Sequence, residues 1–316
     1  MYKYKDFINL CVFIIIVMLS FHPETNPFTS SNHIHTGSVM EVSKNDALYQ
    51  EIQEKSSELN QEPQDAYIDD VWKKTPGRNG LTVNIDRSYK QMKKKGKYND
   101  KLLVYDQIPP EVKLEDLPTA PIYRGHPEKN MVSFLINVSW GGEYIPKILN
   151  ILKENNVKAT FFIEGKWAKE NIDYVKMINE QDHTIGNHAY NHPDMARLSE
   201  QEIVDQISKT NEVLKGITGS SPKWFAPPSG SFSDQVVKSA EQLGMETILW
   251  TVDTIDWKNP TVSVMMNRVM GKIHPGATIL MHPTSSVVHA LPTMIAQIKE
   301  KDLKIGKIDD LLDESR

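Results

Sequence analysis

Apolar and polar positions follow two alternating patterns in the second half of the chain. Short apolar runs, such as MVSFLINV at residues 131–138, are rich enough in branched and aromatic residues for strands buried on both faces. Between these runs apolar residues recur at helical spacing, as Ile145, Ile148 and Leu152 do. About seven such strand–helix units fall within residues 131–316, which predicts an α/β fold in the form of an irregular (β/α) barrel.

The first half of the chain has weaker patterns. Residues 1–21 combine two lysines with an apolar run, which is typical of a signal peptide or membrane anchor. Residues 22–64 are polar without a sustained apolar period and are expected to form a flexible linker. Residues 65–130 hold two strand-like runs around a basic segment, which predicts a small α+β region before the domain at 131–316.

Composition narrows the possible functions. The 36 Lys and Arg residues against 41 Asp and Glu residues give a net charge of -5, which offers no electrostatic reason to expect nucleic-acid binding. The single cysteine, Cys11, lies in the first apolar run, so a disulfide framework and a cysteine metal site are excluded. The N-terminal run predicts an extracytoplasmic protein, either secreted or attached to the membrane through this segment.

In a parallel barrel, reactive groups collect where the strands end. GNHAYNHPD places His188 and His192 four residues apart, so two neutral imidazoles can share one divalent cation, although such a pair alone is more often structural. WTVDTIDW ends in Asp253 and Asp256, which can orient a histidine, bind metal or cap a turn. ILMHP ends in His282, a candidate general acid. A fourth segment, KWFAPPSG, carries paired prolines and no reactive group.

Taken in order, these segments resemble the polysaccharide deacetylases, the NodB-homology fold of carbohydrate esterase family four. The resemblance covers about residues 131–312 and is carried by VKATFFIEG, GNHAYNHPD, WTVDTIDW and ILMHP. Members of this family remove N-acetyl groups from chitin-like or peptidoglycan glycans on an irregular (β/α) barrel. The resemblance therefore implies a hydrolase fold, a cell-wall glycan as partner, and a divalent metal, usually zinc, as cofactor.

The resemblance also implies roles for individual residues. His188 and His192 would be metal ligands, and His282 would protonate the leaving amine with support from Asp253 and Asp256. The residues that would contact the sugar are Trp257, Leu280, Pro227, Pro228 and Trp140.

The first motif departs from the family pattern. It normally reads Thr-Phe-Asp-Asp-Gly, and a branch typical of spore formers reads Thr-Phe-Asp-Ile-Ser-Trp-Gly, with which LINVSWG lines up best. In that register Asn137 replaces the catalytic base and Val138 takes the neighbouring position. A fit on Gly141 instead aligns Ser139 and Trp140 with the two acids. Neither register supplies a carboxylate.

The third motif has changed as well. Ala226 stands where an Arg would hold the base, and Ser229 stands where an aromatic residue is usual. An Arg left beside the neutral Asn137 would be a partly buried cation without its anion, so the two losses have one explanation. Glu143 and Asp194 lie near these motifs in the sequence and are the candidate substitutes for the missing acid.

Three functions remain open at this point. The missing acids favour an exported protein that binds N-acetylated cell-wall glycan with little or no deacetylase activity, and with metal weakly held or absent. The complete fourth and fifth motifs favour an active peptidoglycan N-acetylglucosamine deacetylase that uses His282 and a substitute base. The third possible function is a membrane-anchored scaffold. The analogy with the family also predicts that the protein lies at the surface of a Gram-positive bacterium.

Overall fold

The computed structural model describes residues 46–316. The expected signal or anchor segment and most of the expected linker lie outside this range. Within it, no helix has both the length and the apolar character needed to cross a membrane. The described chain divides into two compact units, one of residues 46–58 and 83–104, the other of residues 59–82 and 105–316.

The first unit contains a helix that was not expected. Residues 47–59 fall within the predicted flexible linker, yet they form α2 (Ala47–Leu59). Tyr49 packs edge-on against Tyr89 of α3 (Ile85–Met92), with ring centroids 5.6 Å apart, and Tyr89 donates a hydrogen bond to Asp46. The linker prediction was wrong here, because the apolar face of α2 is narrow and its partner lies in another part of the sequence.

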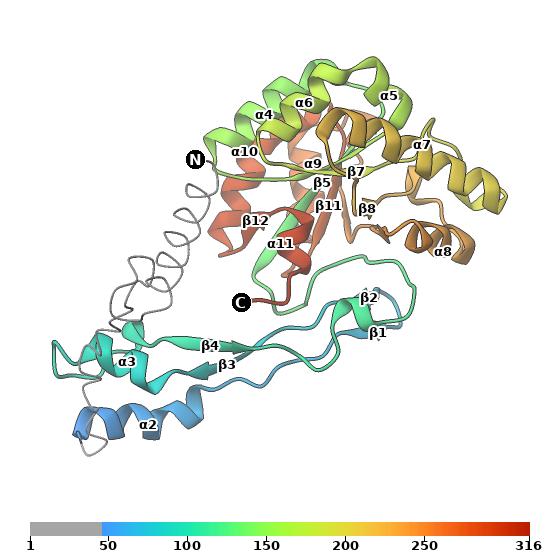
Figure 1. Cartoon of the computed structure of the whole chain (residues 1–316). Helices are drawn as coiled ribbons and strands as arrows, with labels where there is room; N and C mark the ends of the chain where they lie inside the picture. Colours follow the sequence, from blue (N-terminus) through green and yellow to red (C-terminus); the bar gives the residue numbers. More distant parts are fainter. Residues whose placement is uncertain (1–45) are drawn as a thin grey trace, which may run out of the picture. The chain divides into compact units, whose positions relative to one another are not determined.

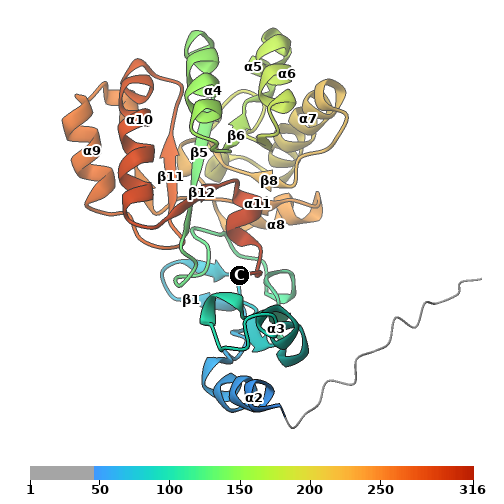
Figure 2. The same cartoon turned by 90° about the vertical axis from the view of Figure 1, so that its left-hand side faces the viewer.

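The second unit is built on one parallel sheet, with strand order β10-β11-β5-β6-β7-β8-β9 and β12 paired with the first residues of β5. Its strands are β5 (Met131–Val138), β6 (Thr160–Ile163), β7 (Thr184–Asn187), β8 (Trp224–Phe225), β9 (Glu246–Thr247), β10 (Val252–Asp253), β11 (Thr278–Met281) and β12 (Lys304–Gly306). Its helices are α4 (Ile145–Glu154), α5 (Gly165–Glu170), α6 (Ile172–Glu180), α7 (Glu200–Thr218), α8 (Asp234–Gln242), α9 (Val262–Met270), α10 (Ser285–Glu300) and α11 (Ile308–Leu312). The predicted irregular (β/α) barrel is confirmed (Figures 1 and 2).

Two apolar layers hold the barrel together. One lies between the sheet and helices such as α4 and α10, and β5 contributes Phe134, Ile136 and Val138 to it. The other fills the barrel interior, where Leu135 of β5 packs with Phe162 of β6 and with residues of α11. Because side chains alternate along a strand, Asn137 follows Leu135 on the interior side, at the C-terminal end of β5.

Residues before the barrel strands also close the barrel. The strands β1 (Tyr67–Asp69) and β2 (Lys73–Thr75) pair antiparallel, and β3 (Gly80–Val83) and β4 (Tyr105–Ile108) form another two-stranded sheet. Ile122 exchanges backbone hydrogen bonds with Thr247 and Leu249, and the Thr278 hydroxyl donates to the carbonyl of Tyr123. The segment around Ile122 therefore lies beside β9 and the first residue of β11, on the side where the two edge strands β9 and β10 do not pair with each other.

One buried histidine predicts how stability depends on pH. Burial is the main cause that lowers the pKa of His183 to about 4, and its Nδ1 accepts the Ala159 N–H at 3.1 Å. Below about pH 6.5 the unfolded chain binds a proton that the folded chain does not, so the free energy of unfolding should fall by up to about 1.4 kcal/mol per pH unit towards pH 4. Urea unfolding of the wild type and His183→Gln between pH 7 and pH 4 measures this. Equal pH dependence in both proteins would contradict the assignment.

Candidate functional site

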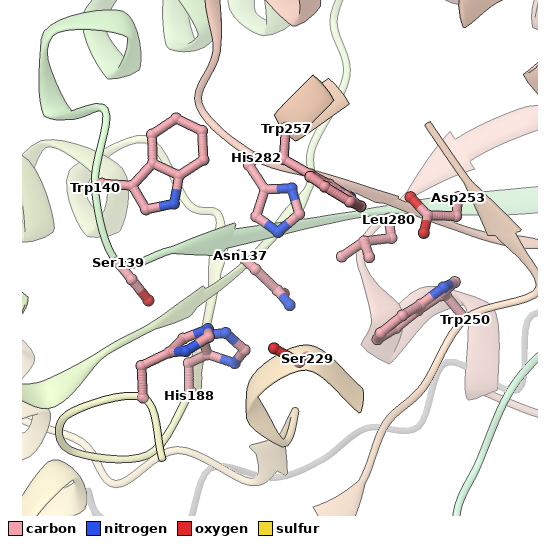
Figure 3. A pocket seen from close by; sticks show the side chains of 11 residues that line it. Asn137, Ser139, Trp140, His188, Ser229, Trp250, Asp253, Trp257, Leu280 and His282 are labelled. Atoms are coloured by element: carbon pink, nitrogen blue, oxygen red, sulfur yellow. The ribbon is translucent and has the colours of Figure 1, made fainter. Parts of the chain in front are cut away.

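A pocket of about 420 Å³ opens at the C-terminal ends of the barrel strands (Figure 3). Its lining residues are Asn137, Ser139, Trp140, His188, His192, Ser229, Trp250, Asp253, Trp257, Leu280 and His282. The structure thus brings together most of the site residues expected from the sequence. Asp256, Pro227 and Pro228 are the expected site residues outside the lining.

The end of β5 places neutral polar groups in the pocket. Asn137 is only 4% exposed, its side chain points into the pocket, and its Oδ1 has no hydrogen-bond partner within the described chain (Figure 3). Val138 belongs to the apolar layer beneath the helices. Ser139 lines the pocket edge. Whichever alignment of the first motif is used, no carboxylate enters the pocket from β5.

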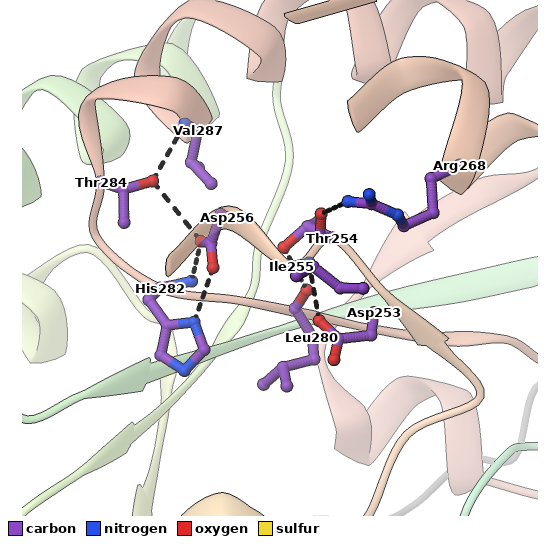
Figure 4. A network of polar contacts seen from close by, with 9 residues as sticks. All are labelled: Asp253, Thr254, Ile255, Asp256, Arg268, Leu280, His282, Thr284 and Val287. Carbon is purple, nitrogen blue, oxygen red and sulfur yellow. Dashed lines mark hydrogen bonds and ion pairs between the residues drawn. The ribbon is translucent and has the colours of Figure 1, made fainter. Parts of the chain in front are cut away.

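The half-buried His282, directly after β11, pairs with the buried Asp256, which follows β10 (Figure 4). The fully buried Asp256 lies with Oδ1 2.8 Å from His282 Nδ1, and its Oδ2 accepts the backbone N–H of His282 and, at 3.5 Å, the hydroxyl of Thr284. A carboxylate held this way fixes the ring orientation and places the proton on Nδ1 when the imidazole is neutral. His282 Nε2 is then the atom available to a ligand in the pocket.

The two acids of the fourth motif have different partners. Asp253 lines the pocket, but its Oδ1 accepts the backbone N–H of Ile255 at 2.8 Å, whereas Asp256 contacts His282 (Figure 4). Ile255 has φ 51 and ψ 37, a left-handed conformation that costs a branched residue roughly 1–2 kcal/mol. This turn carries Asp256 to the first position of a 3-10 helix (Asp256–Lys258), where it faces His282.

His188 and His192 meet at the opposite wall. Their ring centroids are 5.2 Å apart, and His188 Nδ1 lies 2.7 Å from the carbonyl oxygen of Ala226. A carbonyl only accepts, so Nδ1 carries the proton and the Nε2 lone pair is free for a ligand. Burial, and secondarily the charge of His192, lower the pKa of His188 to about 3. Ala226, at the expected Arg position, therefore supports His188 through its backbone.

These donors do not fit the metal centre that the family resemblance implies. Across residues 46–316, no three His, Cys, Asp or Glu side chains come together in a way that could hold a metal ion. Beside the two imidazoles, the polar groups that the end of β5 contributes to the lining are neutral, as in Asn137 and Ser139. Catalytic zinc sites normally take three protein ligands, and the anionic one is missing here.

The proposed substitutes for the missing acid do not line the pocket. Glu143 is exposed, and Asp194 pairs with Arg197 at 3.0 Å and accepts a hydrogen bond from Ser231. Glu164, a buried carboxyl directly after β6, was not among the residues expected from the sequence. Burial raises the pKa of Glu164, while the nearby Ser139 hydroxyl acts in the opposite direction. Asp253 is therefore the one carboxylate in the lining formed by the described residues.

Three indoles surround the opening. Trp140 is 45% exposed and stacks nearly parallel to the His282 ring, with centroids 6.0 Å apart. Trp257 is 54% exposed. Trp250 also lines the pocket and was not expected from the sequence, because a Trp before a strand gives no signal of facing a pocket. Gly230 lies close beneath it, so close that a Cβ at Gly230 would be 2.8 Å from the Trp250 ring.

The turn after β5 holds Trp140 in place. Gly141 has φ +74, and a Cβ there would lie 2.1 Å from the carbonyl oxygen of Pro283. Only glycine allows this close approach between the turns that follow β5 and β11. In the loop after β8, Pro228 is buried and begins the 3-10 helix Pro228–Gly230, so the prolines support Ser229 rather than line the pocket.

Comparison with known proteins relates the chain to the polysaccharide deacetylases. The family model described as polysaccharide deacetylase matches residues 124–248. Uncharacterized protein YlxY of Bacillus subtilis is 48% identical over 99% of both chains, and peptidoglycan-N-acetylglucosamine deacetylase of Bacillus cereus is 38% identical over 55% of this chain and 65% of its own. The structure of wild-type BA3943 from Bacillus anthracis, described as a CE4 family pseudoenzyme, is 55% identical, covers 85% of this chain and 96% of its own, and superposes with a TM-score of 0.83. A mutant of BA3943, 54% identical with a TM-score of 0.83 over 85% of this chain and 99% of its own, is described as having restored enzymatic activity.

Proposed function

The chain belongs to the polysaccharide deacetylase family, carbohydrate esterase family 4, and from this premise we propose that it binds N-acetylated cell-wall glycan with little or no deacetylase activity. The observation that carries the proposal is Asn137 at the end of β5, where the family places its base. An amide cannot accept a proton from water at neutral pH, and loss of a general base typically costs about 10²–10⁴-fold in rate.

The surroundings of Asn137 support the same proposal. Asp253, the carboxylate of the described lining, has one oxygen engaged by Ile255 N–H. In Figure 3 it lies beyond Leu280 as seen from Asn137, so it is poorly placed to replace the base. The exposed Trp140 and Trp257 offer flat apolar surfaces on which sugar rings can stack.

One observation favours a second candidate, an active deacetylase. The His282–Asp256 pair is complete, and the left-handed turn at Ile255 that positions it costs stability. Such a pair would be expected in an enzyme that still protonates a leaving amine. This candidate needs a base that reaches the pocket from outside its present lining.

The proposed location follows from the N-terminal sequence and the family. We propose that residues 1–21 direct the protein out of the cytoplasm and that it acts at the cell wall, as the peptidoglycan deacetylases do. Retention of this segment as a membrane anchor stays a prediction. The small N-terminal region at residues 65–130 is also a prediction.

Glycan binding and acetate release together test the proposal. Isothermal titration of the wild type with N-acetylglucosamine tetramer should show binding, while acetate release stays at background with and without added zinc. Trp257→Ala should weaken binding about tenfold, because a stacking surface is lost, and Ile172→Ala, at a similarly exposed apolar residue on α6, should not. Acetate release by the wild type at the rate of an active family member would establish the second candidate instead.

A further inference from the structure

A cluster of exposed lysines follows the last turn of α3 in the first unit. Six lysines lie between residues 90 and 101, against one acidic residue, Asp100, in a protein whose net charge is -5. These six exposed residues form the lysine patch: Lys90, Lys93, Lys94, Lys95, Lys97 and Lys101. Charge of one sign that is concentrated in this way, within an acidic chain, indicates a surface for an anionic partner.

The packing of α3 leaves the patch open to solvent. Ser88, Tyr89 and Met92 form the buried face of α3, and Tyr89 packs against Tyr49 of α2 (Figure 1). With 3.6 residues per turn, Lys90 lies on the opposite face of this helix. The patch therefore extends from the solvent face of α3 into the turn that follows it.

Within residues 46–316, no acidic side chain forms an ion pair with the patch. Asp86, one turn before Lys90, instead accepts a hydrogen bond from the Tyr49 hydroxyl at 3.2 Å. Basic residues are favoured at the C-terminus of a helix, but this effect is confined to its last turn. Lys97 and Lys101 lie beyond the end of α3 and are not explained in this way.

We propose that the lysine patch binds the phosphate headgroups of an anionic lipid membrane and so holds the first unit at the membrane surface. The inference rests on the proposed export of the chain and goes beyond its glycan binding. In the sequence, only residues 22–45 separate the apolar run at 1–21 from this unit. A basic cluster close in sequence to a membrane segment is typical of surfaces that bind anionic lipid, which favours the membrane over a soluble polyanion.

Electrostatics determine the strength of this contact and its response to salt. Near an anionic membrane each lysine raises the affinity about fivefold, so several lysines acting together give substantial binding. Exposed charges are screened beyond about 10 Å at 0.1 M salt, so the contact should weaken strongly as salt rises. Insertion of an apolar segment into lipid does not weaken in this way, so salt distinguishes the patch from residues 1–21.

Acetylation of lysines in vesicles measures the contact residue by residue. The full-length protein is reconstituted in vesicles of phosphatidylcholine alone and of a two-to-one mixture of phosphatidylcholine and phosphatidylglycerol, and is treated with an uncharged acetylating ester. In the anionic vesicles the patch lysines should react at least about threefold more slowly. Raising the salt to about 0.5 M should remove this difference. The exposed Lys147 of α4 is the internal control and should react equally in both vesicles.

Two triple variants separate charge from folding. The first removes three charges from the turn after α3: Lys94→Gln/Lys95→Gln/Lys97→Gln. The second replaces the same three residues by arginine and keeps their charge. Lys90 and Lys101 should lose their protection in the glutamine variant and keep it in the arginine variant. Thermal unfolding of both variants, expected within a few degrees of the wild type, shows that the fold is retained.

Each other outcome has a distinct meaning. Equal acetylation of the patch lysines in the two kinds of vesicle would overturn the proposal. Equal protection by soluble polyphosphate in phosphatidylcholine vesicles would overturn the membrane as the partner. Loss of protection in the arginine variant would overturn the electrostatic contact. No patch residue lines the pocket, so both variants should bind N-acetylglucosamine tetramer as the wild type does. A protected patch in a protein that binds no glycan would overturn the proposed function and leave this inference standing.

Discussion

Asn137→Asp should give this protein measurable deacetylase activity. The substitution places a carboxylate where Asn137 now points into the pocket, on the interior side of β5 and opposite the complete His282–Asp256 pair. A general base is typically worth about 10²–10⁴-fold in rate, so acetate release from N-acetylglucosamine tetramer should rise by at least about 100-fold over the wild type. The mutant of BA3943 described as having restored activity shows that a similar chain can regain function.

The same substitution should change the response to metal. With a carboxylate in place of the Asn137 amide, the base position would bring an anionic oxygen into the pocket that His188 and His192 also line, and this charge should strengthen the binding of a divalent cation by the two imidazoles. Activity of the variant should therefore be abolished by EDTA and return with zinc. Bound zinc measured by mass spectrometry should rise from well below one ion per chain in the wild type towards one in the variant.

Two further variants separate the possible reasons for success or failure. Asn137→Asp combined with His282→Gln should lose the gained activity, because no group would then protonate the leaving amine. If Asn137→Asp alone stays inactive although it is folded and binds zinc, the base alone is not the missing element. Adding Ala226→Arg to it then tests whether the arginine expected from the family is also required. Acetate release by the wild type as fast as by an active Asn137→Asp variant would contradict the proposed loss of function.

The sequence predicted the barrel well because its signals are local. The apolar run of β5 and the helical spacing in α4 each lie within one short segment, and the motif order fixes which strand ends share the pocket. The different hydrogen-bond partners of Asp253 and Asp256 could not be predicted from the sequence, because they depend on the left-handed turn at Ile255. A branched residue is among the least expected in that conformation.

Other parts were missed because their partners are distant in sequence. Trp250 enters the lining only through the fold of the loop between β9 and β10, and Glu164 is recognised as buried only once β6 lies beside β5. The helix α2 depends on aromatic contacts with α3. Lys74 is the clearest case, because a lysine in a polar stretch gives no sign that it will be among the most buried residues of the protein.

Glu246→Ala should be among the most destabilising single substitutions in the second unit. Lys74 of β2 is 1% exposed, and its Nζ lies 2.6 Å from Oε1 of Glu246 in β9, whose side chain is 31% exposed. Removing the carboxylate leaves a buried ammonium without its anion, which typically costs about 3–5 kcal/mol. Lys74→Met should cost far less, because the apolar chain keeps the packing and Glu246 can turn its charge to the solvent that it already contacts.

Urea unfolding of the two single variants and of the double variant Lys74→Met/Glu246→Leu measures this asymmetry. The double variant should be close to the wild type in stability, since an apolar pair of similar volume often replaces a buried ion pair without loss. Arg197→Ala is the matched control, because it breaks the Arg197–Asp194 pair, whose side chains are 85% and 49% exposed, and such pairs contribute about 0–1 kcal/mol. Equal losses of unfolding free energy in Glu246→Ala and Lys74→Met would mean that the cost comes from losing the contact, and not from leaving the buried Lys74 ammonium without an anion. A loss below about 1 kcal/mol in Glu246→Ala would mean that Lys74 reaches water once its partner is gone, and that β2 is held to the barrel by its backbone bond to Pro121 instead.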